Sequence, residues 1–179
     1  GAAFCYMFAL LPIVFLGIGS TSPMLIASAI ATLRGDSDSV DASERVCRHE
    51  AAHFCCGYWC GLPVSQYSVQ DGVARVEFDV ASSTYSNTEV AALAITALGG
   101  LVAEAMKWGN AVGADQDLRT LETVLMRSAV GASAHQDITR WGALSASLLL
   151  RQNEQKNEKV VEAFQRQASI DDCIAILES

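Results

Sequence analysis

The chain has 179 residues, a formal net charge of −8 and a pI near 4.7. This length suffices for one domain with a substantial core, but not for two large ones. The acidic balance argues against nucleic acid or anionic lipid as the main partner. The sequence contains no GxxxxGK[ST] phosphate loop, so we expect no ATP binding of that kind in this chain.

The first 33 residues contain no charged side chain, and Arg34 is the first charge. Because a membrane-spanning helix needs about 20 apolar residues, we expect segment 1–33 to lie in a membrane. It would form either one span kinked at Pro12 or a span followed by an interfacial helix. The alternative is a buried core hairpin, or a helix docked on a partner subunit. Residues 34–41 are the expected polar linker, and 42–179 the expected folded domain.

An HExxH motif follows the linker, and it uses two of the three histidines in the chain. On a helix, His49 and His53 lie one turn apart on the same face and can offer two imidazoles to one ion. Neutral imidazoles suit tetrahedral Zn²⁺. Glu50 stands beside the first ligand, where it can accept a proton from the attacking water. The alternative is a helix that carries two packed histidines without a metal.

Start and stop signals frame this motif helix. Asp41 is a candidate N-cap, with Glu44 three residues later as its capping-box partner. Gly61 can adopt a left-handed C-cap, and Pro63 cannot continue a helix. The motif therefore lies well inside a predicted helix of about five turns, where the spacing of one helical turn holds.

The cysteines form no CxxC pair, and four of them lie in the region of the motif helix. We expect them to pack as small apolar residues; thiolate metal ligation and a regulatory disulfide are the alternatives. Such cysteine usage is compatible with a reducing compartment. The six are Cys5, Cys47, Cys55, Cys56, Cys60 and Cys173.

Between Tyr67 and Val80, the spacing of apolar residues changes from the helical pattern to alternation. Alternating apolar and polar residues on both sides of Asp71-Gly72 predict a β-hairpin, because Asp-Gly favours a tight two-residue turn. An edge strand of this hairpin could pair with an extended peptide. It could equally be a structural flap.

The remainder reads as helical. Ser86 and Glu89 form a capping box that opens an apolar helix ending near Trp108. Gly99-Gly100 interrupts that helix at about 1 kcal/mol per glycine, a cost tolerated where another backbone approaches closely; we expect the motif helix there. Three further helical regions are predicted: from Asp115 to near Gly131, from Asp137 through Leu150 into a polar surface segment, and from Ser169 to Leu177.

A catalytic zinc site needs a third protein ligand, with the fourth position left for water. A carboxylate oxygen is an acceptable ligand, and one histidine is still unassigned. Residue chemistry alone does not choose among these candidates. They are Glu104, Asp115, Asp117, Glu122 and His135.

Three stretches, 48–54, 97–104 and 113–118, together resemble the peptidase domain of the FtsH zinc metalloproteases, whose pattern is HEAGH, ALGGRxAE and GAxxDL. The resemblance covers about residues 40–178 and implies a mainly α, zincin-like peptidase domain with a small β-hairpin. It implies Zn²⁺ held by His49, His53 and Asp117, with Glu50 as the catalytic base. The tail is more similar to the stand-alone FtsH-like proteins of plastids, which lack the ATPase module. That similarity implies a plastid (chloroplast) membrane location, the thylakoid in particular.

The chain departs from the family pattern at Ala52, which replaces a glycine, at Leu101, which replaces an arginine, and at Ala105, which replaces a glutamate. The leading hypothesis is a zinc-dependent metalloendopeptidase without an ATPase, acting on membrane or unfolded proteins. The rival hypothesis is a non-proteolytic scaffold subunit or assembly factor of a plastid membrane complex. The expected partners are thus a membrane and either protein substrates or subunits of a larger complex.

Overall fold

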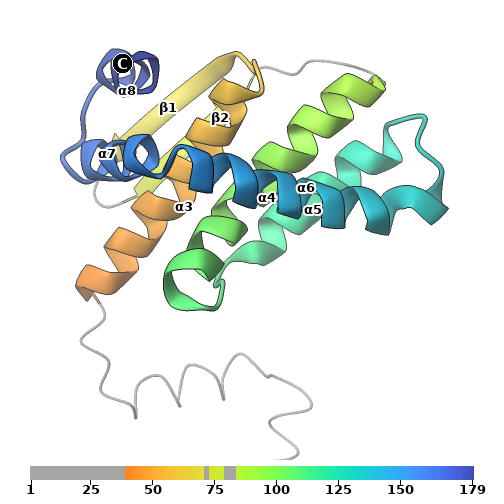
Figure 1. The fold of residues 1–179 in the computed structure, drawn as a ribbon, viewed down its shortest axis with the longest axis horizontal. Coiled ribbons are helices and arrows are strands. Elements are labelled where there is room, and N and C mark those ends of the chain that lie inside the picture. The colour runs from red at the N-terminus through yellow and green to blue at the C-terminus, as the bar shows by residue number, and fades with distance from the viewer. Residues whose placement is uncertain (1–38, 71–72, 79–83) are drawn as a thin grey trace, which may run out of the picture. The chain divides into compact units, whose positions relative to one another are not determined.

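The computed structural model describes residues 39–70, 73–78 and 84–179, and it divides the chain into the units 1–39 and 40–179. The membrane segment predicted at 1–33 lies outside the described residues and stays a prediction. Six helices and one hairpin make up the described part (Figure 1). They are α3 (Ser39–Trp59), β1 (Val64–Gln70), β2 (Val73–Phe78), α4 (Asn87–Trp108), α5 (Ala114–Met126), the 3₁₀ turn η1 (Ala132–Ala134), α6 (His135–Gln152), α7 (Glu154–Gln165) and α8 (Ile170–Glu178).

The central element is α3, which buries two of its faces. One face packs against α7, α8 and the hairpin, with Phe54 against Phe164 and Tyr67 as its main aromatic contacts. The other face packs against α4 and α6 through the small residues Ala52 and Cys56. Burial on two faces is what an element between two core clusters requires, and it holds the HExxH motif rigidly.

The cysteine prediction is confirmed for the described part of the chain. None of the five described cysteines is in a disulfide, and four are buried. Burial raises the pKa of Cys56 to about 12, with Cys60 adding to the shift. The four buried thiols therefore act as small apolar core residues, and Cys60 is half-buried.

The crossing of α4 over α3 confirms the prediction made from the glycine pair. A methyl group on Gly99 would lie 3.0 Å from the carbonyl oxygen of Ala52, a backbone atom of α3. A similar approach joins α4 to α6, where a methyl group on Gly142 would lie 3.2 Å from Ala94. Only glycine permits helices to pack at these distances without displacement.

The hairpin is antiparallel, as predicted, but β1 begins earlier than expected, at Val64. The turn at 71–72 is outside the described residues. A methyl group on Gly57 would overlap the ring of Phe78, so this glycine lets β2 lie directly on α3. The hairpin is thereby held beside the HExxH motif.

Several predicted boundaries need correction. The motif helix begins at Ser39, so Asp41 lies inside it and is not its N-cap. The helix predicted to reach Gly131 ends at Met126, because the chain turns there and Ser128 forms a β-bridge with Tyr85. The capping boxes at Ser86 and Ser169, however, are both formed as predicted.

The prediction that a polar surface segment follows Leu150 is also wrong. It forms α7, a helix that buries Val160, Val161 and Phe164 against α3. Buried Arg48 of α3 adds a polar link to α7, with its guanidinium Nη2 2.9 Å from Glu158 Oε2. Because most residues of α7 are charged or polar, its narrow apolar stripe, which packs in the core, was not recognised from the sequence.

Among the described helices, α4 alone is long and apolar enough to cross a membrane by length and composition. Of its most apolar 18-residue window, 56% is buried inside the fold. Its apolar character is therefore used in packing against α3, α5 and α6.

We expect Gly99→Ala to lower the free energy of unfolding by about 1–2 kcal/mol. The added methyl meets the α3 backbone, and overpacking typically costs about 1–3 kcal/mol, of which improved helix propensity returns up to about 1 kcal/mol. Urea denaturation of the full chain measures the change. The matched control is Gly131→Ala, where φ is −68° and an added methyl group would lie 3.9 Å from Ser133 Oγ; it should change stability by less than about 0.5 kcal/mol. Equal midpoints for both variants would contradict the proposed close packing.

Candidate metal centre

Three chemically active side chains of α3 lie close together. His49, Glu50 and His53 offer ligand atoms that all lie within 4.8 Å of one another. The two imidazole rings meet edge to face, and their Nε2 atoms are 3.0 Å apart. The spacing of one helical turn thus brings both histidines to a single point, as the HExxH pattern predicts.

Hydrogen bonds on the far side of each ring define which nitrogen faces that point. His53 Nδ1 lies 2.7 Å from the carbonyl oxygen of Thr96, which can only accept a hydrogen bond. His49 Nδ1 lies 2.7 Å from Glu104 Oε1, a carboxylate oxygen. Both Nδ1 atoms therefore act as donors, and in the neutral rings both Nε2 atoms present lone pairs to each other.

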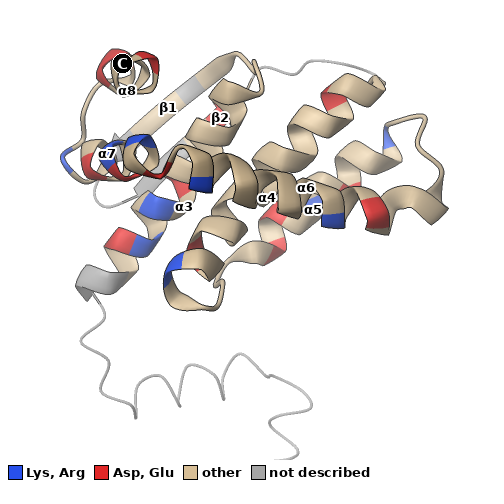
Figure 2. Cartoon of the chain, viewed as in Figure 1, with Lys and Arg blue, Asp and Glu red and all other residues tan. Residues whose placement is uncertain are grey.

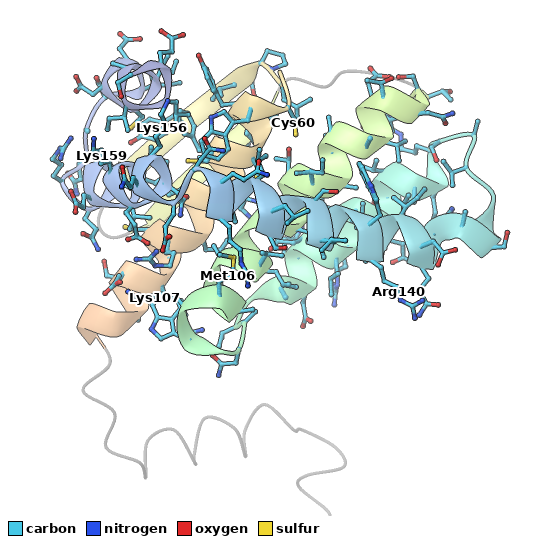
Figure 3. The ribbon with its side chains drawn as sticks, in the orientation of Figure 1. Cys60, Met106, Lys107, Arg140, Lys156 and Lys159 are labelled. Atoms are coloured by element: carbon cyan, nitrogen blue, oxygen red, sulfur yellow. The ribbon has the colours of Figure 1, made fainter. Side chains whose placement is uncertain are left out.

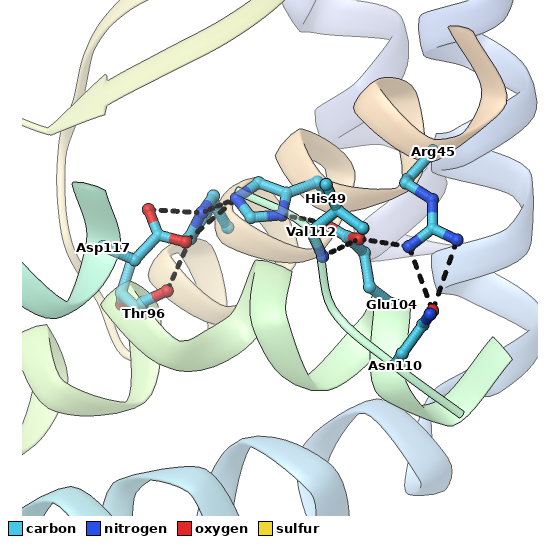
Figure 4. A network of polar contacts seen from close by, with 8 residues as sticks. Arg45, His49, Thr96, Glu104, Asn110, Val112 and Asp117 are labelled. Carbon is cyan, nitrogen blue, oxygen red and sulfur yellow. Dashed lines mark hydrogen bonds and ion pairs between the residues drawn. The ribbon is translucent and has the colours of Figure 1, made fainter. Parts of the chain in front are cut away.

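Asp117, in the first turn of α5, brings a carboxylate to the same point. Its Oδ2 lies 3.0 Å from His49 Nε2, and its Oδ1 lies 3.4 Å from His53 Nε2 (Figure 4). Oδ2 is buried, and it has no hydrogen-bond donor because the nearby Nε2 atoms carry no proton in the neutral rings. Two lone pairs and a carboxylate thus converge, an arrangement that a cation would neutralise.

Without a metal, protons can neutralise this cluster only in part. Burial lowers the pKa of His49, but the Asp117 carboxylate and Glu104 outweigh it, so that the pKa lies above its ordinary value. Burial acts to raise the pKa of Asp117, but the two histidines hold it well below its usual range. One shared proton cannot satisfy three converging groups, whereas a tetrahedral cation binds all three.

The space around the ligand atoms also fits an ion. A methyl group on Gly100 would lie 2.5 Å from His49 Nε2, so only a glycine leaves this side of the ring open. The donor set of two imidazoles and one carboxylate matches catalytic Zn²⁺ sites, which leave one coordination position open. The residues present therefore fit Zn²⁺.

Glu104 orients His49 from behind and is itself held by a polar network. Its Oε2 accepts hydrogen bonds from Arg45 at 2.7 Å and from the backbone N–H of Val112 at 2.9 Å (Figure 4). Asn110 contacts the same guanidinium, which stacks 4.4 Å from the Trp108 ring centre. Glu104 can remain ionised although it is only 1% exposed, because three donors hydrogen-bond to its carboxylate.

Glu50 faces the cleft beside the histidines. Its Oε2 accepts a hydrogen bond from the backbone N–H of Val76, at 3.1 Å, which places β2 along the site. Burial raises the pKa of the Glu50 carboxyl above its ordinary value, against the lowering effect of the two histidines. A carboxylate with a raised pKa is better matched to accepting a proton near neutral pH.

The cleft in front of these groups has a volume of about 760 Å³. Glu50, His53 and Asp117 line one part of it. The rest is lined by β2, by the chain around Tyr85, and by α4 and α5; these residues are Val76, Glu77, Phe78, Tyr85, Leu93, Thr96, Ala97, Gln116, Thr120 and Val124. A volume of this size lies within the range of ligand-binding clefts.

The other candidate ligands lie elsewhere. Asp115 and Glu122 are exposed on α5, and His135 contacts the carbonyl oxygen of Val130 at 3.3 Å. Glu104 is on the Nδ1 side of His49 and so cannot reach the convergence point. Among the acidic candidates, Asp117 is the one that the fold brings to both Nε2 atoms.

Several contributors were not predicted from sequence. The Thr96 carbonyl and the Val76 N–H are backbone groups, so no side-chain pattern marks them. Arg45 precedes His49 by one helical turn and therefore lies on the same face of α3. That spacing was a usable signal, although only the structure identifies Glu104 as its partner.

No protein-family model and no curated protein matches this chain. The chemistry assigned to the site therefore rests on the residues and their geometry.

We expect Glu104→Gln to weaken zinc binding about 10–100-fold, the range typical for a lost partner of a metal-ligating histidine. The amide carries no charge, so it holds the His49 N–H and the Arg45 guanidinium less strongly. Competition with a chelating dye measures the affinity. The control is Glu122→Gln, an isosteric change on exposed α5 that should leave it unaltered. An unchanged affinity in Glu104→Gln would remove the orienting role from this carboxylate.

Proposed function

We propose that this chain is a zinc-dependent, FtsH-like metalloendopeptidase with a zincin-like site. The observation that carries the proposal is the meeting of two Nε2 lone pairs with the Asp117 carboxylate, directly beside Glu50 in an open cleft. His49, His53 and Asp117 would hold the ion. The resemblance seen in the sequence extends the proposal to a plastid membrane, with unfolded or membrane proteins as substrates.

Glu50 and the two histidines would have different roles in the reaction. When bound, Zn²⁺ would supply a Lewis acid that polarises the scissile carbonyl and lowers the pKa of water. Glu50 accepts the proton of the attacking water and then delivers it to the leaving amine. In the neutral rings, Glu104 and the Thr96 carbonyl hold the protons of His49 and His53 on Nδ1, so both Nε2 atoms are left as ligand atoms.

The shape of the cleft supports an extended peptide as substrate. The N–H of Val76 points at Glu50 and away from β1, so this edge of β2 faces the cleft. An extended chain can add to such an edge through main-chain hydrogen bonds. Leu93, Ala97 and Val124 give the facing wall an apolar character, which suits a hydrophobic substrate side chain.

We expect Glu50→Gln to reduce cleavage of an unfolded substrate, such as fluorescein-labelled reduced casein, by about 10²–10⁴-fold. The substitution removes the base but keeps the helix and both imidazoles. Zinc stoichiometry and the unfolding midpoint should therefore stay at wild-type values.

Asp117→Asn is the complementary variant, because it replaces the third ligand with a poorer one and should lower zinc stoichiometry together with activity. Cleavage that persists undiminished in Glu50→Gln would refute the mechanism. If wild type loaded with zinc cleaves no substrate, and Glu50→Gln behaves as wild type in every assay, the non-proteolytic scaffold becomes the better proposal.

A further inference from the structure

The exposed face of α6 carries an apolar stripe. Trp141, Leu144 and Leu148 are 47%, 59% and 49% exposed, respectively. Together with Asp137 before them and Arg151 after them, they follow one another at intervals of four, three, four and three residues. This interval pattern is the heptad spacing of a helix–helix seam.

The opposite face of α6 is occupied. Gly142, Ala146 and Leu150 are buried, and Gly142 and Ala146 pack toward α4 and α3. The stripe therefore points away from the domain core. In Figure 1, α6 crosses the near side of the domain, and no described element covers it. In Figure 3, the labelled Arg140 of α6 projects away from the domain.

We propose that the stripe is an isologous dimer interface, in which α6 pairs antiparallel with α6 of a second copy about a two-fold axis at Leu144. Leu144 lies seven positions after Asp137 and seven positions before Arg151. In the antiparallel pair, each Asp137 therefore faces Arg151 of the second copy. Trp141 packs near Leu148 of the second copy, and the two Leu144 side chains meet at the axis.

Charge complementarity favours a second copy of the chain, in antiparallel orientation, as the partner of this stripe. The stripe has an acidic end and a basic end, and Figure 2 shows α6 uncharged over most of its length with charges near both ends. Asp137 has only an exposed contact with Arg140, at 3.8 Å, and Arg151 has no ion pair among the described residues. Reversal of direction pairs both charges at once, whereas a parallel pair would set like charges together.

A lipid surface fits this face less well. Asp137 is in line with the apolar residues and 79% exposed at its side chain, so it would be carried to the bilayer surface. The net charge of −8 also opposes approach to anionic lipid. A matching helix offers Asp137 a cation, and a bilayer does not.

The dimer would be weak and would leave the proposed active site accessible. A single helix pair lies at or below the low end of the about 1,200–2,000 Å² that stable interfaces bury, the range of weak and transient contacts. No α6 residue lines the cleft. Substitutions on the stripe should therefore change self-association without changing zinc binding.

Sedimentation equilibrium of the full chain in density-matched detergent tests the pairing. We expect a reversible dimer for wild type, and a dissociation constant raised at least about a hundredfold in Leu144→Asp, because two carboxylates would meet at the axis. Asp137→Lys and Arg151→Glu should each raise it about tenfold through like-charge contacts. The double variant Asp137→Lys/Arg151→Glu should restore wild-type association. The control is Asp171→Lys on α8, an equal charge reversal outside the stripe.

The charge swap distinguishes pairing through α6 from self-association through residues 1–33, because the double variant restores association only in an antiparallel α6 pair. A wild type that stays monomeric at all concentrations would overturn it. So would a dimer insensitive to Leu144→Asp, or one that both single charge variants weaken and the double variant does not rescue. If, in addition, Leu144→Asp alone reduced binding to phosphatidylcholine vesicles, the stripe would be a lipid-binding face instead.

Discussion

The close approach of α4 to α3 is the constraint on which the rest of the site depends. Gly99 and Gly100 remove the side chains that would separate the two helices. As a result, the Thr96 carbonyl and the Glu104 carboxylate stand directly behind the two imidazoles. The same pair of glycines thus sets the core packing, the histidine tautomers and the open space at Nε2. A larger distance between α3 and α4 would leave the HExxH motif intact, but the two imidazoles would lose the groups that orient them.

The position of Glu104 shows how the fold supports a buried charge. An isolated carboxylate in this position would cost several kcal/mol or would be protonated. Here Arg45, the Val112 N–H and the His49 N–H each donate to it. Arg45 is one helical turn from His49, and Val112 belongs to the loop that leads into α5. The network therefore ties the loop before Asp117 to the helix that carries the histidines.

The sequence predicted the periodic and local features well. The HExxH spacing, the paired strands on either side of residues 71–72 and the serine capping boxes depend on a few neighbouring residues, and each appears in the fold. Some boundaries were misplaced, and the largest failure was non-local. In α7, Phe164 and its neighbours are buried by contacts with α3 that are distant in sequence, so its charged majority suggested a surface segment. Residue chemistry alone could not choose Asp117, because the choice depends on where the loop before α5 places its first turn.

A metal at this site would connect parts of the chain that otherwise touch little. His49 and His53 belong to α3, whereas Asp117 belongs to α5, which packs mainly on α4 through Leu121 and Leu125. A shared ion would therefore close the loop between the second histidine and Asp117 and hold α5 as one wall of the cleft. Ions that bind only the folded chain stabilise it by mass action. The cleft would thus be most rigid in the chain that holds the ion.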